Sequence, residues 1–165
     1  MDRSTLAGLS RGTLRSDGPD RTRSIGRSLG RAAGAGTVLA LVGELGAGKT
    51  QLTKGVADGL DVLGVVNSPT FVLMNEHPGR LRLFHIDAYR LGDPEEALTA
   101  GLLDDRQADG VVVVEWADRL GGWLPEERLE ITLHASADEP NARVLAWEAH
   151  GEIHARLARE AMQVP

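Results

Sequence analysis

One stretch of the chain has the residue types and spacing of a site that binds phosphate groups. Residues 43–50 have the sequence GELGAGKT, which fits the pattern G-x-x-x-x-G-K-[ST]. Glycines let the backbone curl until successive N–H groups point at one anion, and a helix that begins there adds unpaired N–H groups. In this pattern we expect Lys49 to reach the β- and γ-phosphates of a nucleotide and the Thr50 hydroxyl to hold Mg²⁺.

The residues on either side of this stretch predict a strand before it and a helix after it. Residues 37–42 are an apolar run bounded by glycine, and Leu52, Val56 and Leu60 recur at helical spacing. The alternative is a glycine-rich turn that binds nothing. The strand–loop–helix context favours phosphate binding instead. The chain has only two lysines, so chance is a poor explanation for a lysine at this position of the motif.

Two carboxylates follow predicted strands further along the chain. Asp87 ends the strand predicted over residues 81–87, and Glu115 follows residues 111–114, a run of four valines typical of a strand buried on both faces. Nucleotide enzymes place a carboxylate there to hold Mg²⁺ or to orient water, although Asp87 could cap a turn and Glu115 could lie on the surface. The sequence leaves the division of tasks between them open. We interpret His85 as a packed strand residue.

The remaining elements predict an α/β protein. We expect an antiparallel hairpin after the phosphate-binding helix, and a sheet extension with a packing helix in the last third, where no chemistry is apparent. The N-terminal helix is expected to be capped by Asp17 or Asp20. The predicted helices cover residues 17–33, 49–58, 93–103 and 151–162, the last with Ile153, Leu157 and Ala161 on one face; the predicted strands cover residues 37–42, 70–76, 81–87, 111–114, 128–137 and 143–150.

Composition limits the classes of function. The chain has 165 residues, no cysteine and a formal net charge of −6, so it has no thiolate metal site and is a poor direct binder of nucleic acid. No apolar run approaches the length needed to cross a membrane. Residues 1–31 contain seven arginines and three aspartates. We predict a flexible arm over residues 1–19, with one short edge strand near 12–15 and a transit peptide as the alternative, followed by a single domain over residues 20–165.

In four segments the chain resembles the TsaE (YjeE) family of bacterial ATPases, which support synthesis of threonylcarbamoyladenosine on tRNA. The resemblance extends over residues 22–133. It rests on Thr22-x-x-x-Gly26, the LGAGKT core of the loop, Ser-Pro-Thr-Phe at 68–71 and His-x-Asp-x-Tyr-Arg-Leu at 85–91. Glu115-Trp116 and Leu124-Pro125 complete the pattern. The loop alone identifies a superfamily, but its combination with the other segments is highly specific. The departures, such as Gln51 and Asp118, do not involve the proposed chemistry.

The resemblance implies a P-loop NTPase fold with a mixed β-sheet, a central parallel part, antiparallel strands and flanking helices. It implies binding of ATP and Mg²⁺, weak ATP hydrolysis by the isolated protein, and a cytoplasmic complex with TsaB and TsaD that meets tRNA only through these partners. Carried over by motif, the nucleotide would contact Thr22, Glu44, Leu45, Gly46, Ala47, Gly48, Lys49 and Thr50. Lys49, Asp87 and Glu115 would act in catalysis, and Thr50, Asp87 and Glu115 would hold the metal. Ser68, Pro69, Thr70 and Phe71 would form the first switch, and residues 87–90, with Tyr89 and Arg90, the second. Trp116 is also expected among the switch residues.

Three other classes of protein share parts of this pattern. A P-loop kinase of small molecules would need an arginine-rich lid, and the chain has only scattered arginines after its central strands. A GTP-binding switch would need an Asn-Lys-x-Asp segment, which is absent from the sequence. A nucleotide-binding module without hydrolysis differs only in how water is positioned, and the sequence does not decide that point.

Overall fold

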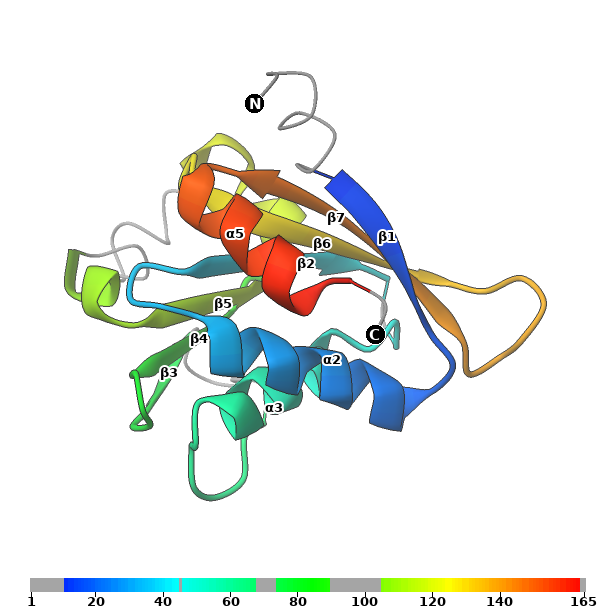
Figure 1. The fold of residues 1–165 in the computed structure, drawn as a ribbon, viewed down its shortest axis with the longest axis horizontal. Coiled ribbons are helices and arrows are strands. Elements are labelled where there is room, and N and C mark those ends of the chain that lie inside the picture. The colour runs from blue at the N-terminus through cyan, green and yellow to red at the C-terminus, as the bar shows by residue number, and fades with distance from the viewer. Residues whose placement is uncertain (1–10, 45, 68–73, 90–104, 164–165) are drawn as a thin grey trace.

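The computed structural model describes residues 11–44, 46–67, 74–89 and 105–163. Within these ranges the chain forms a seven-stranded sheet and three α-helices (Figure 1). The strands are β1 (Arg11–Ser16), β2 (Val38–Gly43), β3 (Met74–His77), β4 (Leu83–Asp87), β5 (Val111–Glu115), β6 (Arg128–Ala135) and β7 (Arg143–His150). The helices are α2 (Pro19–Ala32), α3 (Lys49–Gly59) and α5 (Glu152–Ala161), with short 3-10 helices η1 (Asp105–Asp109), η2 (Ala117–Arg119) and η3 (Gly121–Trp123).

The sheet combines parallel and antiparallel pairs in the order β1-β7-β6-β2-β5-β4-β3. β2 lies parallel to both β5 and β6, and β4 lies parallel to β5. The pairs β1–β7, β6–β7 and β3–β4 are antiparallel. This confirms the predicted mixed sheet. Central parallel strands are covered on both faces, and every residue of β5 is buried, as its run of valines predicts.

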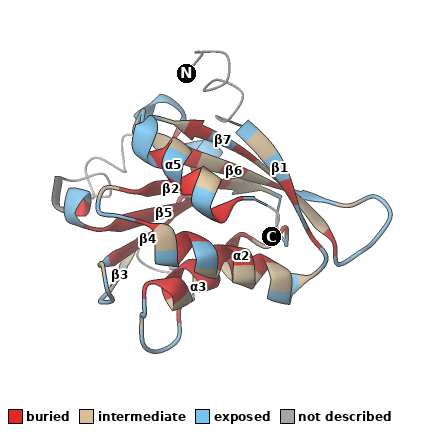
Figure 2. Ribbon diagram, viewed as in Figure 1, coloured by how far each residue is buried: buried red, intermediate tan, exposed pale blue. Residues whose placement is uncertain are grey.

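The hydrophobic core lies on both faces of the sheet, and the three described helices contribute to the same side (Figures 1 and 2). Successive residues of a strand point to opposite faces. In β2, Leu39 and Leu41 therefore join the cluster that contains residues of α2, α3 and α5, whereas Val38 and Ala40 join a second cluster with η2. Both faces of β2 are packed, so the loop that follows it starts from a fixed position.

Helices α2 and α3 contact one another through their backbones. Gly26 and Gly30 of α2 face Gly55 and Gly59 of α3, and an ideal Cβ at Gly55 would lie 2.1 Å from the carbonyl oxygen of Arg23. No side chain fits such a gap, so glycine is needed here for close approach. Because α3 begins at the end of the 43–50 stretch, this contact ties that stretch to α2.

Two predicted details are wrong. The N-cap of α2 is Gly18 and no side chain caps the helix, so neither Asp17 nor Asp20 has the predicted role; Pro19, whose φ is already helical, begins the helix instead. Ile153 is 47% exposed and does not share the buried face of α5. That face contains the buried His154. Its imidazole accepts a hydrogen bond from the first residue of β2, which offsets the cost of burying a polar ring.

The N-terminal segment is partly described. Residues 11–16 form β1 at one edge of the sheet, where the sequence predicts a short strand, and β1 pairs with β7. The predicted domain boundary at residue 19 stays a prediction. Residues 70–73 of the predicted hairpin and the predicted helix over 93–103 lie outside the described residues. Among the helices that are described, none is both long and apolar enough to cross a membrane.

Candidate nucleotide-binding site

The stretch between β2 and α3, which we call the phosphate loop (residues 43–50), is closed by its own backbone. The N–H of Ala47 donates to the carbonyl oxygen of Glu44 over 3.0 Å. Gly46 and Gly48 have φ values of +81° and +107°, a left-handed region that glycine enters without strain. Gly48 is the N-cap of α3, and among the described residues no side chain caps the first N–H groups of that helix. The loop and the helix N-terminus therefore present backbone donors suited to an anion.

Lys49 is 5% exposed and contacts the phosphate loop itself. Its Nζ donates to the carbonyl oxygens of Gly43 (2.5 Å) and Glu44 (2.8 Å). The ammonium also lies 4.0 Å from the centre of the Trp116 ring, within cation–π range. Burial lowers the pKa of Lys49 below its ordinary value, and the negative charge of Glu115 opposes this shift. The predicted phosphate-binding lysine thus lies at the site, held by groups that an anion can replace.

Glu115 is a buried carboxylate with three polar neighbours. The Thr50 hydroxyl donates to Oε1 over 2.8 Å, the Thr53 hydroxyl lies 3.3 Å from Oε2, and His85 Nε2 hydrogen-bonds to the same oxygen. Glu115 is only 2% exposed. A buried carboxylate costs free energy unless it is hydrogen-bonded, and these contacts reduce that cost. The alternative that Glu115 is a surface carboxylate is therefore wrong.

Asp87 lies at the same edge of the sheet because β4 and β5 are parallel. It is the register partner of Glu115, so the carboxyl ends of the two strands bring both carboxylates together. Asp87 is half-buried, and burial raises the pKa of its carboxyl above the ordinary value. The backbone N–H of Tyr89 donates to Oδ1 over 2.9 Å, which favours the ionised form. Asp87 therefore caps a turn, as one of the two interpretations predicts, and it also lines the cavity at the phosphate loop.

The Trp116 ring lies against Lys49, and the Tyr89 ring packs on Trp116. The rings of Tyr89 and Trp116 are 4.8 Å apart and tilted by 48°, and the Arg119 guanidinium lies 5.4 Å from the centre of the Tyr89 ring. Trp116 has a φ of +58°, a left-handed backbone conformation that is unusual outside glycine. Strained backbone of this kind concentrates at functional sites. The Trp116 ring therefore lies on the site.

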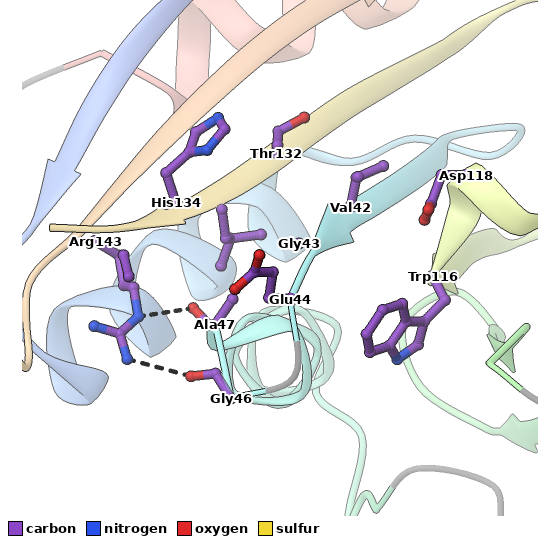
Figure 3. A pocket seen from close by; sticks show the side chains of 12 residues that line it. Val42, Gly43, Glu44, Gly46, Ala47, Trp116, Asp118, Thr132, His134 and Arg143 are labelled. Carbon is purple, nitrogen blue, oxygen red and sulfur yellow. Dashed lines mark hydrogen bonds between the residues drawn. The ribbon is translucent and has the colours of Figure 1, made fainter.

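Two cavities meet at the phosphate loop. The first, of about 380 Å³, is lined by Lys49, Thr50, Asp87, Tyr89, Glu115 and Trp116, together with loop backbone. The second, of about 600 Å³, lies over the ends of β2 and β6 and shares Gly46 and Trp116 with the first. Figure 3 shows this second cavity with Trp116 and Asp118 on one side and His134 and Arg143 on the other.

The donor set of the first cavity fits a nucleotide with Mg²⁺. Glycine backbone and Lys49 suit phosphate oxygens, and the Thr50 hydroxyl beside the Glu115 carboxylate gives the oxygen ligands that Mg²⁺ prefers. Within the described ranges there is no cluster of three or more His, Cys, Asp or Glu side chains that could hold a metal ion. Mg²⁺ commonly takes one or two carboxylates and completes its octahedron with water and phosphate.

The other predicted site residues are placed as follows. Thr22 is buried, its hydroxyl lies 2.7 Å from that of Ser16, and its methyl group is near Gly48. Leu45, Arg90 and the predicted switch Ser68, Pro69, Thr70 and Phe71 lie outside the described residues.

Sequence reasoning missed three residues that the structure brings to the site. The sequence predicts a packed His85, but the imidazole also contacts Glu115 of the neighbouring strand. The signal for this contact is that His85 lies two residues before Asp87 on the same strand, so both side chains point to one face. Thr53 lies one helical turn after Lys49. Arg143, in the part of the chain without apparent chemistry, donates to phosphate-loop carbonyls (Figure 3), and no local signal indicates this.

Comparisons with known proteins identify the family of the chain. A family model described as "Threonylcarbamoyl adenosine biosynthesis protein TsaE" matches residues 16–144. The chain is 41% identical over 143 residues to the "tRNA threonylcarbamoyladenosine biosynthesis protein TsaE" of Bacillus subtilis, covering 86% of this chain and 88% of that protein. It is 43% identical over 114 residues to the protein of the same description from Streptomyces coelicolor, with 67% and 77% covered.

The fold comparison gives the same result. The crystal structure of YdiB from Bacillus subtilis superposes with a TM-score of 0.76 at 33% sequence identity, over 92% of this chain and 94% of that one. This confirms the predicted P-loop NTPase fold. Similarity in sequence and in fold over most of its length shows that the chain belongs to the TsaE family, whose members take part in tRNA threonylcarbamoyladenosine biosynthesis.

Proposed function

We propose that the chain binds ATP with Mg²⁺ at the phosphate loop and hydrolyses it slowly on its own. We also propose that it supports tRNA modification by binding the TsaB–TsaD complex and resetting it between turnovers. The observation that best supports ATP hydrolysis is Glu115, a buried carboxylate 2.8 Å from the Thr50 hydroxyl at the end of the loop motif. A merely structural loop would not need a carboxylate buried at that point.

Binding would exchange contacts that already exist. Lys49 would leave the carbonyl oxygens of Gly43 and Glu44 for the β- and γ-phosphate oxygens, and the N–H groups at the start of α3 would bind the same phosphates. Thr50 and Glu115 would hold Mg²⁺. When bound, this ion neutralises negative charge on the phosphate oxygens.

Asp87 is the candidate for orienting the attacking water. In the reaction, a water oxygen bonds to the γ-phosphorus while the bond from that phosphorus to the bridging oxygen breaks, giving ADP, phosphate and a proton. Asp87 is half-buried at the edge of the cavity, and burial moves its pKa upward, toward that of a general base. Glu115 is already engaged by Thr50, Thr53 and His85, which suits a metal ligand better.

The partners would complete the site. Within the described residues, the side chains that line the 380 Å³ cavity include no arginine, and in such ATPases a partner can supply one. TsaB and TsaD are the partners that family membership suggests. Contact with tRNA through these partners, in the cytoplasm, agrees with the net charge of −6.

The test is Mg²⁺-dependent ATP hydrolysis by the chain alone and with purified TsaB and TsaD. Lys49→Ala is compared with Lys54→Ala, which removes the only other lysine of the chain from the same helix. We expect weak hydrolysis that the partners raise, loss of about 100-fold or more in Lys49→Ala, and wild-type rates in Lys54→Ala.

Other results would overturn the proposal. Hydrolysis that ignores both the partners and the loss of Lys49 would exclude a switch ATPase. Transfer of the γ-phosphate to a small acceptor would identify the alternative, a P-loop kinase. Tight ATP binding without turnover, even with both partners present, would identify a binding module.

A further inference from the structure

We propose that Arg143 is a positioning residue that holds the phosphate loop in the conformation that binds anions. The inference rests on the proposed function, since it concerns how tightly the loop binds a nucleotide. It assigns a task to the last third of the chain, where the sequence indicates no chemistry.

The contacts of Arg143 join two parts of the molecule. Nη1 donates to the carbonyl oxygens of Pro140 and Ala142, at 2.8 Å each, which fixes the guanidinium to the β6–β7 turn. Nε donates to the carbonyl oxygen of Ala47 and Nη2 to that of Gly46, at 3.2 Å each (Figure 3). Arg143 is also the first residue of β7, where it is paired in register with β6 and β1, so its backbone position is set by the sheet.

These contacts fix two peptide planes of the loop. In a peptide unit, the carbonyl oxygen and the N–H of the next residue point in opposite directions across a rigid plane. Holding the Gly46 oxygen therefore directs the Ala47 N–H inward, where it closes the loop on Glu44. Holding the Ala47 oxygen directs the Gly48 N–H to the side away from Arg143. Arg143 thus binds carbonyl oxygens on one side of the loop, and the Gly48 N–H is left on the other side, where an anion would bind.

The glycines of the loop explain why such a residue is useful. Gly46 and Gly48 have positive φ values and more backbone freedom than any other residue type, so an unsupported loop loses more entropy when it orders around a ligand. Contacts that order the loop beforehand increase affinity by reducing that cost. A guanidinium has several N–H donors in one plane and can bind both carbonyls and the turn together, which a lysine ammonium cannot match in geometry.

Arg128 gives a matched control. It is the first residue of β6, and its Nη1 donates to the carbonyl oxygens of Pro125 and Glu126, while Nε and Nη2 donate to Glu130. Like Arg143, it fixes a turn at the start of a strand. None of its contacts within the described residues involves the phosphate loop. Replacing Arg128 therefore measures the effect of losing an arginine that fixes a turn but does not contact the loop.

The experiment compares Arg143→Gln, Arg143→Lys and Arg128→Gln in the full chain. Hydrogen exchange of the amides of residues 46–49 is measured without ligand, ADP affinity by calorimetry, and ATP hydrolysis at saturating substrate. We expect Arg143→Gln to raise the exchange rate and to weaken ADP binding by about tenfold each, since both charge-assisted hydrogen bonds to the loop are lost. The kcat should stay within about threefold, so the loss appears in KM. Arg143→Lys should be intermediate, and Arg128→Gln should leave exchange and affinity within about twofold of wild type.

Unchanged exchange of the loop amides in Arg143→Gln, or an equal effect in Arg128→Gln, would overturn the proposal. If Arg143→Gln does not fold, Arg143→Lys decides in the same way: faster exchange with weaker ADP binding supports the proposal, and unchanged values overturn it. Failure of the wild-type chain to bind ADP would instead disprove the proposed function. The exchange measurement, made without ligand, would still decide whether Arg143 holds the loop.

Discussion

The two halves of the sheet contribute to the site in different ways. The parallel half (β2, β4 and β5) ends in the phosphate loop, Asp87 and Glu115, whose side chains can contact a nucleotide. The antiparallel half (β1, β6 and β7) lies beside the same loop but contacts it through Arg143, which binds main-chain oxygens. One half presents reactive groups, and the other supports the backbone that binds phosphate.

The direction of the strands explains this difference. Parallel neighbours have their carboxyl ends at one edge, so residues that follow them, such as Asp87 and Glu115, meet there. In the antiparallel half, the turn between β6 and β7 reaches that edge with Arg143 at its end, beside Ser16 at the carboxyl end of β1. The candidate reactive side chains therefore follow the ends of parallel strands, whereas the supporting arginine follows the turn of an antiparallel pair.

The reactive groups and the loop support both require that α3, which follows the phosphate loop, stays packed against α2. Breaking this helix contact should therefore have the largest effect. Gly55→Ala places a Cβ 2.1 Å from the carbonyl oxygen of Arg23, which cannot move without shifting the helix. We expect the free energy of unfolding to fall by about 3 kcal/mol, measured by urea denaturation. Gly34→Ala is the control, because a Cβ there meets nothing within 4 Å. Equal stability of the two variants would show that the helices repack freely.

Carboxylates in the two halves should differ in activity. Glu115→Gln removes the charge beside Thr50 and should lower ATP hydrolysis by about 100-fold. Glu130→Gln changes a carboxylate of the antiparallel half that is 34% exposed and paired with Arg128, and it should leave the rate unchanged. Steady-state phosphate release measures both. Similar rates for Glu115→Gln and wild type would remove Glu115 from the proposed mechanism.

Histidines in the two halves should differ in stability. His85→Ala deletes a fully buried imidazole that hydrogen-bonds to Glu115, leaving a cavity and a carboxylate with one donor fewer. We expect a loss of about 2 kcal/mol in the free energy of unfolding. His134→Ala, at an exposed position of β6, should change it by less than about 0.5 kcal/mol. A stability loss in His134→Ala that matches the His85→Ala loss would contradict this difference.

The smallest effect concerns pH and the contact between α5 and β2. His154 Nε2 accepts a hydrogen bond from the Val38 N–H over 3.0 Å, which requires the neutral ring, and burial lowers the pKa of His154 below 6.5. The unfolded chain therefore binds more protons at acidic pH, and stability should fall as the pH drops from about 6.5 to the lowered folded value, by at most about 1.4 kcal/mol per pH unit.

Urea titrations between pH 5 and pH 8, approximate limits set by the ordinary histidine range, measure this dependence. His154→Gln keeps a polar side chain at the position and should flatten the acid side of the curve. Part of the pH dependence should remain in this variant, because burial also lowers the pKa of His77. An identical pH dependence in His154→Gln and wild type would show that the contact with Val38 does not depend on the charge of the ring.

Local patterns were sufficient for the elements of the parallel half. The phosphate loop, the four valines before Glu115 and the strand that ends at Asp87 are each defined by residues adjacent in sequence, so spacing alone predicted them. Strands β6 and β7 were predicted for the same reason. The exposed side of Ile153 was not, because it depends on neighbours from other elements. The cap of α2 was predicted wrongly although Pro19, the local residue that begins the helix, was visible in the sequence.

The sequence by itself determined which residues could bind phosphate, that a mixed α/β fold surrounds them, and which family the chain resembles. Only the tertiary structure decided that His85 contacts Glu115 from an adjacent strand, and that Arg143 binds a loop 96 residues before it in the chain. The contact of His154 with Val38 joins residues 116 positions apart. Such contacts follow from strand order and helix packing, which bring distant residues together, whereas periodicity and spacing describe only the residues within one element.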